Sequence, residues 1–318
     1  MRIIIQPPST IDQWMQSFFQ HLQQIDVAYN TLIGYKRDLE CFLTFYQKAY
    51  SHQDTFAYLQ PADIVHFRQT MLHEHKLAAT TVNRRLHALR RFCRFCHDNG
   101  WLQDNPATHV RSMRHSKRSQ PKGLGIRETF ALLQAADPRK KRLGARNHAL
   151  IQLFLQTGLR VSEVSGLLVG DLVMYDRSGC VHVRDGKGHR QRTVPLNATV
   201  RRAMREYFLT RQGLQAQDDA FVNERGRGLS IRSIQHTVSQ IAQQAGLGDR
   251  QVSAHTLRHT FALNYLRDNP GKLSELARLL GHDSVDTTTI YACSSEQDMA
   301  EDLERSRFNT EKDLVDRR

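Results

Sequence analysis

Apolar residues recur every three or four positions along the first hundred residues of the chain, which is the spacing of one helix face. The first such stripe consists of Ile11, Trp14, Phe18 and Leu22. Further stripes predict helices over 31–46, from Pro61 to Leu72, and over 80–96. The last of these closes at Asn99-Gly100, a helix-stop signal. We therefore predict a small all-α domain at the N-terminal end.

The pattern changes further along the chain, where helical stretches are joined by one alternating segment. Residues 180–184 and 192–196 read as two strands around a Gly-Lys-Gly turn, which predicts a β-hairpin. Helices are expected over 127–136, 145–157, 197–212, 231–245, 256–268 and 274–280, and again after Asp286. The predicted fold class is therefore mainly α with a small β-sheet (α+β).

A basic stretch separates these two parts. Residues 111–127 hold six basic residues and no acidic one, and they include Pro121, Gly123 and Gly125 without a helical apolar stripe. Such a segment is typical of an extended linker. The predicted organisation is a helical domain over 1–110, a linker over 111–125, a second domain over 126–293 and an acidic tail over 294–318.

The charge of the chain indicates what it binds. The 318 residues carry a net charge of +13, and the excess lies outside the tail, which has five basic and eight acidic residues. A solvated surface alone would also explain a positive charge, but the basic linker and an arginine-rich face on the fourth helix favour nucleic acid. The candidate DNA-binding residues are Lys36, Arg84, Arg85, Arg90, Arg91, Arg114, Lys117, Arg118 and Lys122.

Several other functions are excluded by what the sequence lacks. No apolar run approaches the roughly 20 residues that span a bilayer, so no membrane partner is expected. The five cysteines are an odd number in a chain of this length, which is typical of reduced thiols. Cys93-Arg-Phe-Cys96-His97 matches a haem attachment motif but falls within an amphipathic helix, where buried thiols are the better interpretation. We expect no metal and no cofactor.

The candidate catalytic residues lie in four short segments of the predicted second domain. Arg160 lies in Thr157-Gly-Leu-Arg160-Val-Ser-Glu163, where Gly158 ends one helix and Ser162 is placed to cap the next. Lys187 lies between glycines at the tip of the hairpin. His255 and Arg258 are three apart on one helix face. His282 follows the helix-breaking Gly281, and Tyr291 comes nine residues later.

Taken together, these residue types suit phosphodiester chemistry. Two arginines can hold non-bridging oxygens and stabilise the charge of a pentacoordinate transition state. A tyrosine hydroxyl can act as the nucleophile. A lysine or a histidine can protonate the leaving oxygen or help to deprotonate the tyrosine.

The ordered set Arg160, Lys187, His255-x-x-Arg258, Leu-Gly-His282 and Tyr291 resembles the tyrosine recombinase (phage integrase) family. Two stretches resemble the helical core-binding domain of its Xer-type members, namely Thr31-Leu-x-x-Tyr35-x-x-Asp38-Leu39 and the stretch from Thr80-Thr-Val-Asn-Arg-Arg85 through Asn105-Pro-Ala107. The resemblance implies that Tyr291 attacks the scissile phosphate and leaves a 3′-phosphotyrosine and a free 5′-hydroxyl. It implies that Arg160, Arg258 and His282 hold the phosphate, that Lys187 is the general acid and that His255 assists proton transfer.

The resemblance also implies an assembly and leaves the biological role open. Free monomers or weak dimers would form a homotetramer on two double-stranded DNA sites and recombine them through a Holliday junction, without ATP, in the cytoplasm at the nucleoid. A mobile-element role is favoured by the extended tail, and Xer-type resolution of chromosome or plasmid dimers is the alternative. A type IB topoisomerase and a non-cleaving DNA-binding protein are the alternatives of other classes.

The acidic tail carries a separate hypothesis. Ser-Ser-Glu-Gln-Asp298 is a helix-start pattern, and Met299 and Leu303 are four residues apart on the helix that would follow. We expect these two side chains to dock on a neighbouring protomer. A solvated terminal helix explains the same pattern.

Overall fold

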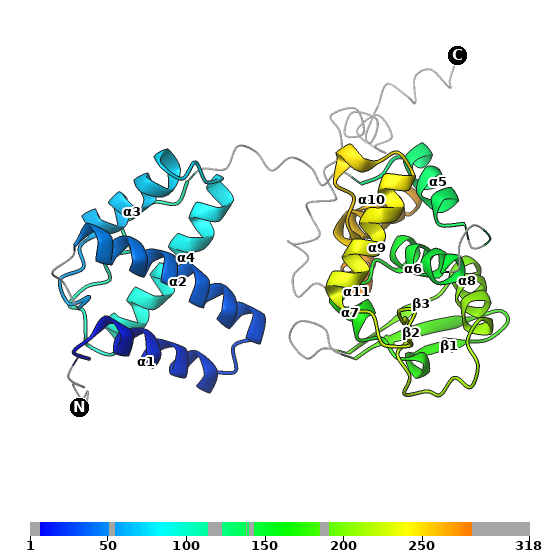
Figure 1. Ribbon diagram of the computed structural model, residues 1–318, viewed down its shortest axis with the longest axis horizontal. Coiled ribbons are helices and arrows are strands. Elements are labelled where there is room, and N and C mark those ends of the chain that lie inside the picture. Colours follow the sequence, from blue (N-terminus) through cyan, green and yellow to red (C-terminus); the bar gives the residue numbers. More distant parts are fainter. Residues whose placement is uncertain are drawn as a thin grey trace, which may run out of the picture. The chain divides into compact units, whose positions relative to one another are not determined.

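The computed structural model describes residues 7–50, 55–113, 123–137, 139, 143–184 and 191–281. The chain divides into two compact units, Met1–Arg118 and Ser119–Arg318, so the division falls within the predicted linker (Figure 1). Each unit has its own hydrophobic core. The predicted helix after Asp286 lies outside the described residues.

The described part of the N-terminal unit has the four predicted helices. They are α1 (Ile11–Gln24), α2 (Tyr29–Ala49), α3 (Pro61–His73) and α4 (Ala79–Asp98). The side chains of the predicted stripes lie in an aromatic core, with Trp14, Phe18 and Phe92 almost fully buried. Gly100, which ends the last turn of α4, has a φ of 75°, a conformation that glycine adopts without strain.

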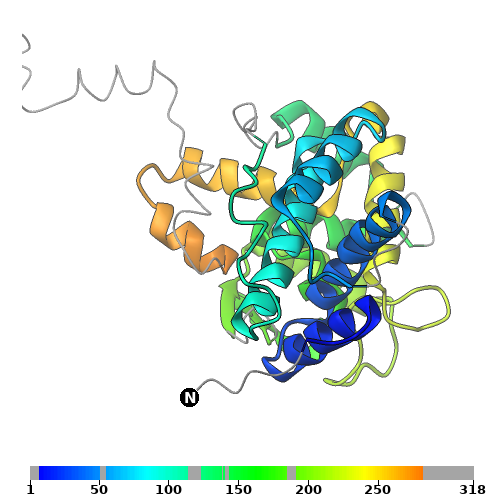
Figure 2. The same cartoon turned by 90° about the vertical axis from the view of Figure 1, so that its left-hand side faces the viewer.

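Seven α-helices form most of the described C-terminal unit. They are α5 (Ile126–Ala135), α6 (Gly144–Thr157), α7 (Val161–Ser165), α8 (Ala198–Leu209), α9 (Ile231–Gln244), α10 (Ala254–Asp268) and α11 (Leu273–Leu280). Two short 3₁₀ turns, Val169–Asp171 and Gly248–Arg250, lie between them. Helix α6 is buried on most of its surface and packs against α8 and α10 (Figure 1). Helices α10 and α11 lie beside each other across a short turn (Figure 2).

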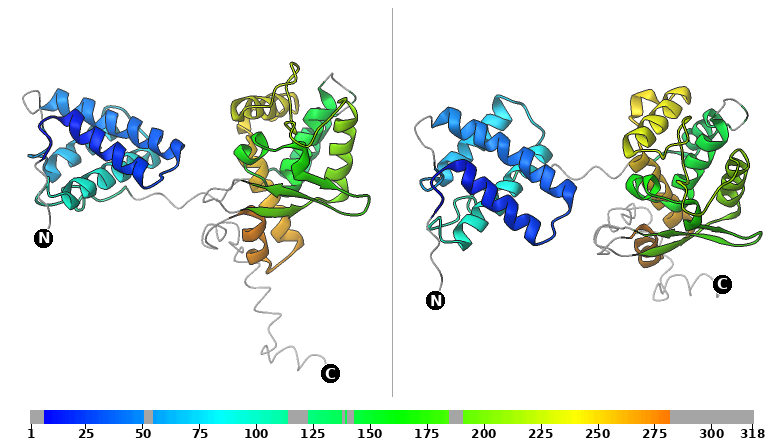
Figure 3. Two further views of the ribbon diagram at one scale, coloured as in Figure 1. Left: turned by 90° about the horizontal axis from the view of Figure 1, so that it is seen from below. Right: turned by 60° about the horizontal axis from the view of Figure 1, so that its bottom comes forward.

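A three-stranded antiparallel sheet completes the C-terminal unit (Figure 3). The predicted hairpin is confirmed as β2 (Gly179–Val183) and β3 (Arg192–Pro195), and β1 (Leu172–Met174) pairs with the other side of β2. Val181 and Val194 are opposite each other and face the core. Strand β1 was not predicted, because three residues are too few to show an alternating pattern.

Both ends of the predicted linker are bound to the unit next to them. Asn83 on α4 exchanges two hydrogen bonds with the backbone of Met113, at 2.8 and 3.0 Å. At the other end, the buried backbone N–H of Leu124 donates to Thr260 Oγ1 on α10 at 2.8 Å. The segment between these anchors, 114–122, lies outside the described residues. Of the linker as predicted, residues 111–113 therefore belong to the first unit and 123–125 to the second.

Candidate active site

The turn between α6 and α7 places Arg160. Gly158 ends α6 with a φ of 62°, and a Cβ there would lie 2.4 Å from Phe261 Cδ1, so both the backbone and the packing require glycine. Arg160 precedes α7 in an extended conformation, and its backbone N–H donates to Glu163 Oε2 at 2.7 Å. The prediction that Ser162 caps this helix is therefore wrong. The helix begins two residues earlier than such a cap would place it, at Val161, and the carboxylate of Glu163 takes the capping role.

Glu163 is the buried anion around which this corner is built. Each carboxylate oxygen accepts two N–H groups, because Arg192 donates to both at 2.8 and 2.9 Å and Arg160 adds its Nη1 and its backbone N–H. Only 2% of the Glu163 side chain is exposed. Burial by itself raises the pKa of Glu163, but the hydrogen bonds and charge of Arg192, with those of Arg160, outweigh it and lower the pKa. Glu163 is thus a stable negative charge that both arginines share.

Helix α10 contributes Arg258 and His255. Arg258 is 4% exposed, and its Nη1 donates to the carbonyl of Gly158 at 2.6 Å, so it holds the corner that carries Arg160. His255 lies about one turn earlier, with the ring of His259 at 4.1 Å between centroids. Partial desolvation, followed by the positive charge of Arg258, lowers the pKa of His255. A neutral imidazole at physiological pH is a competent proton acceptor.

The three arginines meet at the C-terminal end of α11. Backbone carbonyls in the last turn of a helix have no partner within the helix. Here three consecutive carbonyls each receive an arginine N–H from a different part of the fold. Along the helix these bonds are Arg192 Nε to Leu279 O, Arg258 Nη2 to Leu280 O and Arg160 Nη2 to Gly281 O, each at 2.8 Å. The arrangement fixes the backbone immediately before His282.

The structure brings together the predicted site residues that it describes. Arg160 and Arg258 donate to adjacent carbonyls, and His255 shares a helix face with Arg258. The other three predicted catalytic residues, Lys187, His282 and Tyr291, lie outside the described residues.

Sequence reasoning missed Glu163 and Arg192. A signal existed for each of them. Glu163 is three residues after Arg160, at the third position of the helix, where a carboxylate can reach back to the helix start. Arg192 is two residues before the inward-facing Val194, so the alternation of β3 places a charged side chain on the core face.

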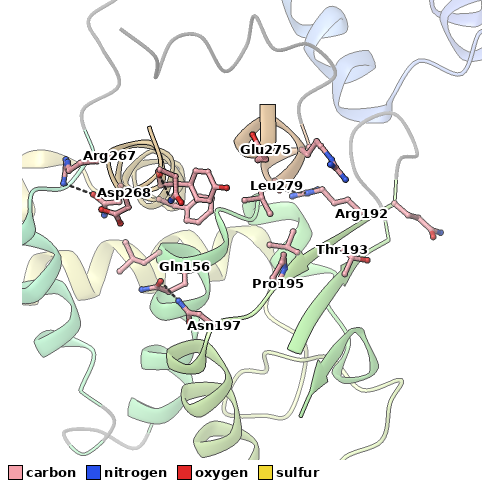
Figure 4. A pocket seen from close by; sticks show the side chains of 18 of the residues that line it. Gln156, Arg192, Thr193, Pro195, Asn197, Arg267, Asp268, Glu275 and Leu279 are labelled. Carbon is pink, nitrogen blue, oxygen red and sulfur yellow. Dashed lines mark hydrogen bonds between the residues drawn. The ribbon is translucent and has the colours of Figure 1, made fainter. Parts of the chain in front are cut away.

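A cleft adjoins this cluster on one side. It has a volume of about 1200 Å³ and is lined by residues of β3, α10 and α11, and by Gln156 of α6. Figure 4 shows Arg192 extending from β3 toward Leu279 on α11 at its edge. Of the three arginines, Arg192 lines the cleft.

Three of the five predicted DNA-binding residues on α2 and α4, namely Arg84, Arg90 and Arg91, have close protein partners in the described structure. Arg84 pairs with the buried Asp38, and Arg91 lies over the ring of Tyr35 at 5.4 Å. Arg90 donates to backbone carbonyls, among them that of Val110, and so holds the chain that leaves the domain.

The other two candidates on these helices, Lys36 and Arg85, differ in their exposure to solvent. Lys36 is exposed and 4.0 Å from Glu40, whereas Arg85 is half-buried. The candidates of the linker, namely Arg114, Lys117, Arg118 and Lys122, lie outside the described residues.

Cys93 and Cys96 are both fully buried in the core of the N-terminal unit. Burial raises the pKa of Cys93 to about 12 and also raises that of Cys96. The interpretation of these thiols as buried apolar groups is confirmed. Within the described ranges, no cluster of three metal-ligating side chains is present and no helix is long and apolar enough to cross a membrane.

A pair of arginines at one helix end, with a histidine on the same helix as one of them, can bind a phosphate group. The chain belongs to the phage integrase family: the family's catalytic domain matches residues 126–298, and its N-terminal SAM-like domain matches residues 15–100. It is therefore a site-specific recombinase of the tyrosine type, an enzyme that cleaves and rejoins DNA through a tyrosine intermediate.

Relatives of known class agree with this assignment. The tyrosine recombinase XerC of Thermodesulfovibrio yellowstonii is 33% identical over 87% of this chain and 90% of its own. The tyrosine recombinase XerD of Halalkalibacterium halodurans is 31% identical over 89% of this chain and 93% of its own.

Solved structures share the fold. The XerH recombinase bound to palindromic difH substrate superimposes with a TM-score of 0.73 at 19% identity, over 95% of this chain and 90% of that one. The Tn1549 transposon integrase with a circular intermediate DNA has a TM-score of 0.75 at 18% identity, over 93% of this chain and 99% of that one.

Proposed function

We propose that this recombinase acts through six catalytic residues, Arg160, Lys187, His255, Arg258, His282 and Tyr291. The observation that carries the assignment is the pair of adjacent carbonyls, those of Leu280 and Gly281, that bind Arg258 and Arg160. These two arginines come from parts of the chain about a hundred residues apart, and both are held where the backbone reaches His282.

In the proposed first step, the scissile phosphate binds against the two arginines. Arg160 uses one N–H of each terminal nitrogen on Glu163 and Gly281, and each of these nitrogens carries a second N–H. With 28% of its side chain exposed, Arg160 is open to a ligand. Arg258 is more deeply buried and supports both the charge and the turn. The cations stabilise the charge that builds up on the non-bridging oxygens in the transition state.

The bond changes balance within the substrate and the six residues. The Tyr291 oxygen forms a bond to phosphorus as the bond from phosphorus to the 5′ oxygen breaks. The tyrosine proton passes to His255, whose lowered pKa leaves it neutral and able to accept, and Lys187 supplies a proton to the 5′ oxygen. Rejoining is the reverse reaction with the 5′-hydroxyl of the partner strand. The covalent bond retains the phosphodiester energy, so no ATP is required.

The enzyme is proposed to work as a homotetramer on two DNA sites, through a Holliday junction, and as a monomer or weak dimer when free. We expect it in the cytoplasm, at the nucleoid. The N-terminal unit is proposed to bind the DNA together with the catalytic unit, with the basic linker crossing the DNA backbone. The acidic tail over 294–318 is proposed to dock on a neighbouring protomer through Met299 and Leu303. Deleting residues 295–318 should then weaken cooperative synapsis, and unchanged synapsis contradicts this docking.

Two biological roles fit this reaction. Recombination for a mobile element is the role expected from the sequence. Resolution of chromosome or plasmid dimers is the second candidate, favoured by XerC and XerD relatives at 31–33% identity over most of the chain. The sequences that the enzyme selects distinguish them, because a site beside its own gene or element ends favours the first and a single chromosomal site favours the second.

A covalent-capture experiment tests the proposed function. Nicked duplexes with randomised arms are incubated with the enzyme, and those trapped on protein are recovered and sequenced. We expect a palindromic site, attachment through a 3′-phosphate, and complete loss of the adduct in Tyr291→Phe. Strand exchange between two matched sites, but not between unmatched ones, separates a recombinase from a type IB topoisomerase. Site-specific binding without any adduct contradicts the proposal and leaves a DNA-binding protein.

A further inference from the structure

Arg192 is the arginine at the end of α11 to which the proposed catalytic set gives no role. Only 11% of its side chain is exposed, although it lies at the first position of β3, directly beyond the hairpin segment that carries Lys187. A buried guanidinium is costly unless hydrogen bonds compensate it. The contacts of the Arg192 guanidinium therefore indicate its role.

All three nitrogens of Arg192 are engaged. Nη1 and Nη2 form a two-pronged contact with the carboxylate of Glu163, at 2.8 and 2.9 Å, and Nε donates to the carbonyl of Leu279 at 2.8 Å. One end of this arrangement holds the carboxylate that also binds Arg160. The other end holds the last turn of α11, from which the chain continues to His282.

We propose that Arg192 is a positioning residue that sets the spacing between Arg160 and the α11 end, and so between the two sides of the phosphate-binding site. The inference rests on the proposed function, since it assigns Arg192 a role in the same site. It concerns the half of the site that binds the phosphate, not the general acid. Arg192 does not touch the reacting atoms in this scheme.

The chemistry of the guanidinium explains why an arginine is required. Its planar fork presents two parallel N–H groups to a carboxylate and a further N–H on its other edge, so one rigid group fixes two partners at a set distance. A lysine ammonium is a point charge on a flexible stem. It neutralises Glu163 but cannot fix the carboxylate plane and the Leu279 carbonyl together.

Gly281 provides a second observation that this spacing is tight. A Cβ at this residue would lie 2.9 to 3.1 Å from three atoms of the Arg192 guanidinium. Gly281 also has a φ of 64°. The end of α11 therefore passes directly against the guanidinium plane, and a small shift of Arg192 displaces the backbone before His282.

The experiment compares Arg192→Gln and Arg192→Lys with the wild type on a nicked duplex that the wild type selects. The matched control is Arg201→Lys, because Arg201 is another buried arginine of this unit that holds backbone carbonyls, those of Leu196 and Asp176. The readouts are the DNA dissociation constant, the single-turnover rate of adduct formation and the unfolding temperature.

We expect both Arg192 variants to bind DNA within about threefold of the wild type but to form the adduct about 100-fold more slowly, because displacements near 1 Å have effects of this size. Arg201→Lys should lower the unfolding temperature without a matching loss of rate. An Arg192 variant whose rate falls no further than that of Arg201→Lys at equal loss of stability overturns the proposal.

A substrate with sulfur at the bridging 5′ position identifies which half of the site is affected. A thiolate leaves without protonation, because a thiol has a pKa of about 8.5, so this substrate bypasses the general acid. It should restore the rate of Lys187→Ala but not that of Arg192→Gln. Restoration of Arg192→Gln would place Arg192 with the hairpin instead and overturn the inference.

The double variant Arg192→Gln/Glu163→Gln tests the connection through the carboxylate. If Arg192 acts through Glu163, the two changes are not additive, and the double variant is no slower than the slower single variant. Fully additive losses contradict that route.

If the wild type forms no adduct at all, the proposed function fails and this inference fails with it. A normal wild type with normal Arg192 variants removes this inference alone.

Discussion

Gly158→Ala offers a direct test of the corner that carries Arg160. Gly158 has a φ of 62°, and alanine in this left-handed region costs about 1–2 kcal/mol. The new Cβ would also lie 2.4 Å from Phe261 Cδ1 and 2.9 Å from Leu280 Cδ2, inside the packed core between α6, α10 and α11. Overpacking of this kind costs about 1–3 kcal/mol more.

The two contributions together predict that the catalytic unit loses about 2–5 kcal/mol of stability. For a unit of roughly 200 residues, each kcal/mol lowers the unfolding temperature by about 2–4 °C, so a shift of about 4–20 °C is expected. Calorimetry on the full-length chain measures it as a change confined to one of the unfolding transitions.

Gly246→Ala is the matched control for this prediction. Gly246 also follows a helix and has a φ of 73°, but a Cβ there would meet nothing within 4 Å. It therefore carries the backbone penalty without the clash. If Gly158→Ala loses no more stability than Gly246→Ala, the packing of Phe261 and Leu280 against this corner is not as described, and the placement of Arg160 loses its support.

Three further predictions follow from other contacts. Thr260→Val should lower the free energy of unfolding by about 1–3 kcal/mol in urea titrations, because the buried N–H of Leu124 loses its acceptor, whereas Thr260→Ser should keep most of the stability. Desolvation, together with the charges of His255 and Arg258, lowers the pKa of His259 from 6.5 to about 4, so stability should fall as the pH drops through this range, where the unfolded chain binds a proton that the folded chain does not. An unchanged slope in His259→Gln contradicts this. DNA affinity should fall by well over tenfold between about 50 and 200 mM salt, and a nearly constant affinity contradicts contact with many phosphates.

Most helices were predictable because they are long enough to show their period, and some of them, such as α4, α6 and α11, also end at asparagine or glycine. Helix α7 and strand β1, with five and three residues, are too short to carry such a signal. Their positions are determined by tertiary contacts, such as the bond from Arg160 N–H to Glu163 and the pairing of Leu172 with Val181.

The site was predictable as a list of residues but not as an arrangement. The order of Arg160, His255 and Arg258 indicated the chemistry, whereas the convergence of three arginines on one helix end depends on contacts between residues far apart in the chain. The basic residues of α4 show the same limit. In the sequence, Arg84 and Arg90 are two positive charges that could bind DNA. In the structure, Arg84 forms an ion pair with Asp38, and Arg90 donates hydrogen bonds to backbone carbonyls.

The contacts at the C-terminal end of α11 also determine whether an anion can approach this helix end. The peptide dipoles of a helix leave roughly half a negative charge at its C-terminus, which repels phosphate. Three guanidinium groups bind to that end, with one carboxylate shared between two of them, so the local charge becomes clearly positive. A helix end that would ordinarily exclude a DNA backbone is thereby made to attract one.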